Sequence, residues 1–253
     1  MDERILKWLS YGLLPAALLA FWAAASHSGR IPALLLPTPE SVAAAFVALL
    51  SSGELARHIG ASALRSLSGF GLAASLGIAL GLINARSDRA RRAGHIVLEA
   101  LRVTPPLSVI PLLILWLGID EAPKIAIVFL TSFFPIYMNT LTAVRGVDPK
   151  LEEVGRVLRF SPAERFRLLT LPAALPGIFT GLRLGFGYSW RALVGAELIA
   201  ASSGLGFLIS ESAEFAKTET VFVGIFTIAA LGVLMDAVLL RLFDRLAPGP
   251  KAR

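Results

Sequence analysis

Residues 146–173 read GVDPKLEEVGRVLRFSPAERFRLLTLPA, a charged stretch in a chain of 253 residues, of which 55% are hydrophobic and 17% are charged. A segment that only joins two helices needs about 2–8 residues, so this longer one has structure of its own. Asp148 and Ser161 are typical N-cap residues, and each is followed by a proline suited to the first helical position. Glu164 completes a capping box with Ser161. The stretch therefore predicts two short helices that form a hairpin.

Apolar windows before and after this hairpin approach the roughly 20 residues that a membrane-spanning helix needs. A soluble domain carries about 25% charged residues, well above the fraction found here. The sequence thus predicts an all-α integral membrane protein with about six transmembrane helices, in a single domain over residues 1–253. The six windows are 8–25, 60–83, 98–117, 123–144, 174–200 and 220–242.

Glycines and prolines in these windows indicate how the helices pack. Gly77 and Gly81, and then Gly177, Gly181 and Gly185, recur every four residues, a spacing that lets helix backbones approach closely in lipid. The third and fourth windows should be kinked by their prolines, which are Pro105, Pro106, Pro111 and Pro135. Both features predict a bent helical bundle.

Positive charge between the windows sets the expected orientation. Lysine and arginine cluster in residues 4–7, 86–92, 145–167 and 241–253, whereas the alternate segments hold only Arg30, Arg57, Lys124 and Lys217. Cytoplasmic loops carry the excess of these residues, which predicts that both chain ends and the hairpin are cytoplasmic. The first window also resembles a cleavable signal peptide. Its start is not net basic, so we expect a retained helix.

Composition argues against several classes of protein. The chain has no cysteine, which excludes disulfides and thiolate metal sites, and His27, His58 and His95 stand in no metal-ligand spacing. The net charge of +6 lies next to apolar windows, so it predicts membrane orientation and no nucleic acid partner. No Gly-rich loop ends in Gly-Lys-Ser or Gly-Lys-Thr, so we expect the chain not to bind ATP in that way. We expect no metal, cofactor or catalytic residue.

An apolar side on the hairpin needs a cover outside the membrane. Leu151, Val154, Val157 and Leu158 lie on one side of its first helix. The candidates for this cover are lipid, another part of this chain and a separate protein, and the nearby arginines are compatible with a lipid surface. The pattern by itself leaves these three alternatives open.

At these residues the sequence resembles the inner-membrane permeases of binding-protein-dependent ABC importers. Their hallmark loop begins with Glu, two small residues, three variable positions and Gly, and it ends in an aliphatic residue, a variable one, Leu and Pro. Glu153 and Gly155 match its start, and Leu171 with Pro172 match its end, but Arg159 stands where the family has glycine. Because glycine adopts positive φ cheaply, we expect the turn to bend differently or to shift toward Phe160-Ser161.

Further stretches, such as LWLGIDEAPKI and AELIAASSGLGFLI, extend the resemblance from about residue 36 to 242 and look like the nitrate/sulfonate/taurine branch, most like the permeases for aliphatic sulfonates. The resemblance implies a homodimer in the bacterial inner membrane. It also implies two cytoplasmic ATPase subunits that hold ATP and Mg²⁺, and a periplasmic binding protein. The cargo would be a small anion, with taurine, nitrate or a vitamin precursor as alternatives to a sulfonate. The residues expected to couple the hairpin to the ATPase are Glu153, Gly155, Arg156, Arg159, Ser161, Leu171 and Pro172. Leu171-Pro172 should end the second hairpin helix.

Charges inside the windows suggest a substrate pathway. A charge at the bilayer centre costs about 3 kcal/mol, so such residues usually face protein or water. Arg183 and Arg191 are eight positions apart, about 80° around a helix, and should share a broad face that attracts an anion. Arg102 and Glu197 are further candidates, and pairing of Arg183 or Arg191 with Glu197 or another carboxylate is the structural alternative.

Two other classes of protein remain as competing hypotheses. An ion-driven secondary transporter would have paired intramembrane carboxylates or interrupted helices in matching halves, and neither is evident. A membrane-embedded enzyme would need catalytic side chains at one depth, and none are grouped in this way.

Overall fold

The computed structural model describes the backbone of residues 3–246 and the side chains of residues 12–246. All regular structure in this part of the chain is helical, so the predicted fold class is confirmed. The long helices are α1 (Glu3–His27), α3 (Glu54–Arg86), α6 (Glu121–Arg145), α9 (Leu171–Ala200) and α11 (Thr218–Leu246). The shorter ones are α2 (Pro39–Ser51), α4 (Asp88–Val103), α5 (Ile110–Leu117), α7 (Pro149–Val157), α8 (Pro162–Arg165) and α10 (Leu205–Glu214). A 3₁₀ turn, η1 (Pro106–Val109), precedes α5, and a π-helical segment, η2 (Phe166–Thr170), precedes α9.

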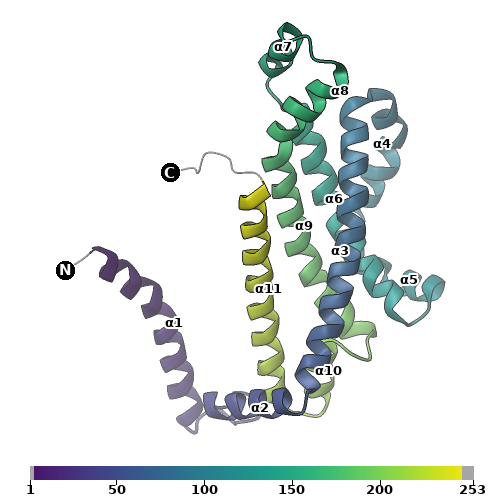
Figure 1. Ribbon diagram of the computed structural model, residues 1–253. Helices are drawn as coiled ribbons and strands as arrows, with labels where there is room; N and C mark the ends of the chain where they lie inside the picture. The colour runs from purple at the N-terminus through teal and green to yellow at the C-terminus, as the bar shows by residue number, and fades with distance from the viewer. Residues whose placement is uncertain (1–2, 247–253) are drawn as a thin grey trace.

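The long helices α3, α6, α9 and α11 form an elongated bundle (Figure 1). The hairpin of α7 and α8 projects from one end, which we call the hairpin end. Helix α2 lies across the opposite end beside α10, and we call this the far end. Helices α3 and α9 therefore connect the two ends of the molecule.

Four helices are long and apolar enough to cross a membrane: α3, α6, α11 and the continuous helix Pro162–Ala200. The third predicted window, 98–117, is broken between α4 and η1–α5, which meet at 90° and together make a possible fifth span. Pro105 and Pro106 at the break remove two backbone donors, which explains a bend larger than an ordinary kink. The first predicted window, 8–25, lies within the 25-residue helix α1, and the charges predicted at Lys251 and Arg253 lie outside the described residues.

Glycines allow α6 to pack closely against both α3 and α9. A Cβ atom added at Gly81 would lie 2.7 Å from Thr140 Cβ, and one at Gly181 would lie 2.7 Å from Asn139 Cβ. Both distances are too short for real side chains, so the small residues make this approach possible. The packing role predicted from the glycine spacing is confirmed for these helices.

Helix α1 stands largely apart from the bundle (Figure 1). Its contact with α11 is near the far end, where the Trp22 ring stacks on Phe222 with centroids 5.6 Å apart. Trp22 Nε1 also donates a hydrogen bond to the Pro37 carbonyl at 3.0 Å. Leu14 and Phe21 remain 67% and 74% exposed, so α1 leaves an apolar face uncovered.

Candidate functional site

The predicted caps of the hairpin are present. The Asp148 carboxylate accepts a hydrogen bond from the Lys150 N–H at 2.9 Å and so begins α7. Ser161 and Glu164 form the capping box: Ser161 N–H donates to Glu164 Oε2 at 2.8 Å, and Glu164 N–H donates to Ser161 Oγ at 3.3 Å. The bonds from Ser161 hold the pKa of the Glu164 carboxyl below its ordinary value. These local bonds start the two hairpin helices at the expected residues.

The turn between the hairpin helices is built on Arg159, which has a φ of +57°. Phe160 N–H donates to the Gly155 carbonyl at 2.9 Å and Arg159 N–H to the Arg156 carbonyl at 3.0 Å, the two bonds of a Schellman motif. The expectation of a different or shifted turn is therefore wrong. Arg159 instead takes the left-handed conformation that suits glycine, at a cost of roughly 1–2 kcal/mol.

Gly155 lies at the contact between the two hairpin helices. It is buried, and an added Cβ atom would lie 2.8 Å from Arg165 Cγ and 2.9 Å from Leu169 Cδ1. The lack of a side chain at Gly155 therefore allows α7 to pack against the segment that follows α8. This contact lies within the chain and fixes the shape of the hairpin.

The second hairpin helix does not end at Leu171-Pro172, which corrects the prediction. The helix runs without interruption from Pro162 to Ala200, 39 residues, through the π-helical turn of η2. Leu171 N–H donates to the Phe166 carbonyl across this turn. Pro172 directly follows this π-helical turn and does not interrupt the helix. The hairpin and α9 are one continuous element.

The apolar residues of the hairpin point in two directions. Leu169 faces α7, and Phe166 lies under the Arg86 guanidinium, 3.3 Å from the ring centroid, which ties the hairpin to α3. The outward side is uncovered, and it carries Val154, Val157, Leu158 and Leu168 at 47%, 82%, 55% and 54% exposure. The predicted residues Glu153, Arg156, Arg159, Ser161 and Pro172 are also exposed, whereas Leu171 is half-buried.

Arg183 and Arg191 line one groove between α9 and α11, with a volume of about 840 Å³, as their spacing predicts. Arg183 is held by Asp236 of α11 in a two-point ion pair: Nε–Oδ1 and Nη2–Oδ2 are both 2.8 Å. No carboxylate pairs with Arg191 among the described residues. The groove therefore contains one compensated cation and one uncompensated cation.

The other two pathway candidates lie elsewhere. Arg102 pairs with Glu99 of its own helix at 2.7 Å and lines a separate cavity of about 150 Å³ against α6. Glu197 is buried and bonds to Arg65 of α3, so its predicted pairing partner, an arginine, is present but is neither Arg183 nor Arg191. The four candidates do not form a single site.

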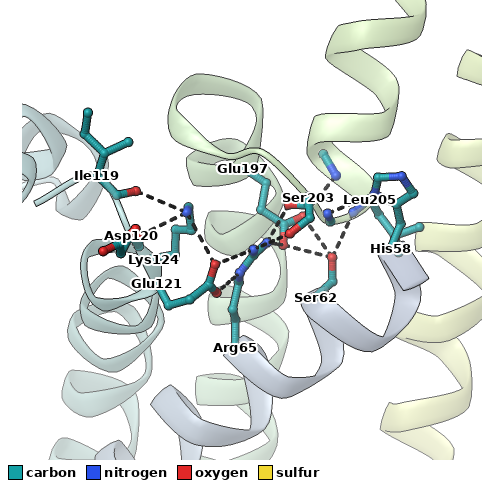
Figure 2. Close-up of polar contacts among 12 residues, drawn as sticks. His58, Ser62, Arg65, Ile119, Asp120, Glu121, Lys124, Glu197, Ser203 and Leu205 are labelled. Atoms are coloured by element: carbon teal, nitrogen blue, oxygen red, sulfur yellow. Dashed lines mark hydrogen bonds and ion pairs between the residues drawn. The ribbon is translucent and has the colours of Figure 1, made fainter. Parts of the chain in front are cut away.

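Arg65 is the centre of a buried ion network that the sequence reasoning missed (Figure 2). Its side chain is 1% exposed, and Nη1 donates to Glu197 Oε1 at 2.7 Å and to the Ser203 carbonyl at 2.6 Å. Nη2 donates to Glu121 Oε1 and to Ser203 Oγ, both at 2.8 Å, and Nε also bonds to Glu121. A single arginine thus connects α3, α6, α9 and the turn before α10. A charge at position 65 inside the window 60–83 was the available signal.

The same network receives the first backbone N–H groups of the α10 region. Gly204 N–H donates to His58 Nδ1 at 3.0 Å, Leu205 N–H to Ser62 Oγ at 2.9 Å, and Gly206 N–H to Glu197 Oε2 at 3.0 Å. Gly204 has a φ of +111°, and a Cβ atom there would collide with Glu197 and Arg65. The SSGLG sequence of residues 202–206 is therefore fitted to this network.

Within residues 12–246, whose side chains the structure describes, His, Asp and Glu make no group of three or more able to hold a metal ion. The features with functional potential are thus the exposed hairpin, the groove and the buried network. Together they define a polytopic membrane protein with an exposed helical hairpin at one end and a charged groove in its helix bundle.

Comparison with known proteins defines this class further. Residues 73–248 match the family model described as binding-protein-dependent transport system inner membrane component. The chain belongs to this family, so it is the permease of an ABC importer and a multi-pass inner membrane protein. Family membership replaces the secondary-transporter and enzyme hypotheses.

Among its relatives, the chain is similar to the putative aliphatic sulfonates transport permease proteins SsuC of Bacillus subtilis (42% identity; 94% of this chain and 86% of the relative) and Escherichia coli (42%; 97% and 94%). The Escherichia coli taurine transport system permease protein TauC is 34% identical over 98% of this chain and 95% of its own. The fold is also similar to a chain of the MetNI methionine ABC transporter, with a TM-score of 0.62 and 17% identity over 77% of this chain and 94% of that one.

Proposed function

We propose that this permease passes an aliphatic sulfonate across the inner membrane, driven by ATP hydrolysis in separate ATPase subunits. The cargo is supported by two relatives, both named as putative aliphatic sulfonates transport permeases, that are 42% identical over nearly the whole chain. Taurine and nitrate are the alternative cargoes, because more distant relatives are named as permeases for them. A vitamin precursor is a further alternative that the resemblance implies.

The observation that carries the coupling mechanism is the uncovered apolar side of the hairpin. Val157 alone is 82% exposed, and a contiguous apolar stripe on a rigid, capped hairpin fits the surface of a protein partner. The partner is an ATPase subunit, and ATP and Mg²⁺ bind to that subunit rather than to this chain. Glu153, Arg156, Arg159 and Ser161 surround the stripe and contact the ATPase. Gly155, Leu171 and Pro172 act indirectly, because they shape the hairpin and its continuation into α9.

In this proposal the hairpin end of the molecule lies in the cytoplasm, and both ends of the chain lie on the same side of the membrane. The far end then faces the periplasm and receives the binding protein. Each of the two ATPase subunits binds one hairpin, so the importer contains two copies of this chain. Each copy is a single permease domain. The uncovered apolar face of α1 is compatible with contact to a second copy or to lipid.

The groove between α9 and α11 offers one contact for the anion. Arg183 and Asp236 neutralise each other, so Arg183 is a structural tie between helices. Arg191 lacks such a carboxylate, and an arginine in a membrane span that faces lipid would be costly. Arg191 therefore attracts the sulfonate group, while Arg102 and Glu197 belong to other contacts.

The proposal is tested with the permease, its ATPase and its binding protein reconstituted in liposomes. Uptake of a radiolabelled alkanesulfonate should require ATP and binding protein, and a tenfold excess of taurine or nitrate should compete poorly. Uptake that follows an ion gradient without ATP, or strong preference for taurine or nitrate, would contradict the proposed mechanism or cargo, respectively. Val157→Glu should abolish ATP-dependent uptake, because it places a charge on the proposed contact.

A further inference from the structure

The Arg65 network joins α3, α6, α9 and the turn before α10 (Figure 2). The Arg65 and Glu197 side chains are 1% and 0% exposed, whereas Glu121 is 55% exposed. Lys124 adds a second cation, 3.7 Å from Glu121, so the two cations balance the two carboxylates. Removing one buried charge would leave its partner uncompensated and destabilise the fold.

The position of α10 depends on this network. Helix α10 has no side-chain cap of its own, and its first N–H groups are satisfied by His58 and Ser62 of α3 and by Glu197 of α9. Arg65 binds both the Ser203 carbonyl and its hydroxyl. The turn and the start of α10 are therefore fastened to α3 and α9 by side chains, and α10 moves with α9.

Helix α9 connects this fastening to the hairpin. The continuous helix Pro162–Ala200 contains Glu197 near its far-end terminus and the hairpin residues at its other terminus. Thirty-nine residues at 1.5 Å each give a length of about 58 Å. A displacement of α10 that shifts Glu197 is passed along this helix to the hairpin, because helices and packed side chains move as units.

We propose that Arg65 is a positioning residue for coupling: by clamping Ser203 and Glu197 together, it makes α10 and the hairpin respond as one body. This inference rests on the proposed function, because it assumes a binding protein at the far end and an ATPase at the hairpin. The loaded binding protein would favour one position of α10, and the clamp would bias the hairpin accordingly. Without the clamp, the bond from Gly206 N–H to Glu197 would remain, but the turn at Ser203 would be released and less of the signal would reach the hairpin.

The test uses the complete importer in liposomes and compares basal ATPase activity with activity stimulated by loaded binding protein. The main variant is the double change Arg65→Gln with Glu197→Gln, which removes both buried charges together and leaves groups that still form hydrogen bonds. Glu121→Gln is a milder variant that keeps the buried pair. The control is Arg91→Gln, which removes an arginine of α4 from a surface pair and leaves Asp88 with its second partner, Arg145.

We expect the double variant to keep basal ATPase activity within about twofold while stimulation by binding protein falls at least fivefold, a coupling loss of about 1 kcal/mol. Glu121→Gln should give a smaller loss, and the control should match the wild type. Full stimulation in the double variant would overturn the inference, and so would a parallel loss of basal activity and stimulation, which marks a merely structural role. No stimulation in the wild type would instead contradict the proposed function itself.

A second measurement does not depend on assembly. The chain has no cysteine, so Ala213→Cys on the exposed side of α10 accepts a single spin label. In the membrane-embedded permease, loss of the clamp should increase the mobility of this label, while a label at Val157→Cys on the hairpin should be unchanged. Equal mobility at position 213 with and without the clamp would overturn the inference even if the double variant assembles poorly.

Discussion

Replacing Arg159 by glycine should strengthen the turn of the hairpin. Arg159 has a φ of +57°, and the left-handed conformation costs a residue with a Cβ atom roughly 1–2 kcal/mol. Glycine removes this cost but adds about 0.5–1 kcal/mol of conformational freedom to the open state. The net expected stabilisation of the closed turn is about 0.5–1 kcal/mol, which corresponds to a factor of about 2–5 in the opening equilibrium.

Hydrogen exchange of the permease in lipid nanodiscs measures this opening directly. The Phe160 amide donates to the Gly155 carbonyl across the turn, so its exchange should slow by about 2–5-fold in Arg159→Gly. Arg159→Ala is the matched control, because alanine loses the charge but keeps the Cβ atom and its cost. If the glycine and alanine variants exchange alike, or if Phe160 exchanges faster in Arg159→Gly, the reasoning from backbone strain is refuted.

Three further predictions follow from the groove, the bundle and the capping box. Arg191→Gln should lower alkanesulfonate uptake about tenfold, because it removes about the binding free energy of one charge-assisted hydrogen bond. Assembly with the ATPase should be intact, and unchanged uptake would remove Arg191 from the pathway. Gly81→Leu should destabilise the α3–α6 contact by at least about 1–3 kcal/mol in thermal unfolding, because its Cβ atom meets Thr140; an unchanged melting temperature contradicts this packing. Because the pKa of Glu164 is lowered in the folded hairpin, the ionised carboxylate stabilises the hairpin at pH values above 4.5, the ordinary carboxyl pKa. This stabilisation is lost as the pH falls through the lowered pKa. Exchange of the hairpin, corrected for its intrinsic pH dependence, should rise there in the wild type but not in Glu164→Gln, whose side chain does not titrate; equal pH dependence in both contradicts the role of the box.

Local chemistry made much of the hairpin predictable. Caps depend on residues only two or three positions apart, so Asp148 and Ser161 identified both helix starts from sequence. The conformation of Arg159 was not predictable from its own preference, because the bonds of the Schellman motif impose the left-handed turn. The continuation through Pro172 was also missed, since a π-helical turn is not evident in an apolar pattern.

Contacts across long sequence separations explain why the buried network was missed. Arg65 and Glu197 are 132 positions apart, and Arg65 and Glu121 are 56 apart. Spacing within one helix identifies a shared face, as it did for Arg183 and Arg191, but it contains no information on which helix lies opposite. Charges in separate apolar windows indicate that partners exist, and only the packing shows which residues pair.

Cross-linking from one introduced cysteine tests the central claim most directly. The chain has no cysteine of its own, so Val157→Cys, on the exposed side of the hairpin, can carry a photoactivatable cross-linker in the assembled importer. The account predicts a cross-link from position 157 to the ATPase subunit, and none to that subunit from Ala213→Cys at the far end. A cross-link from 157 to the binding protein, or to no second protein, would contradict it.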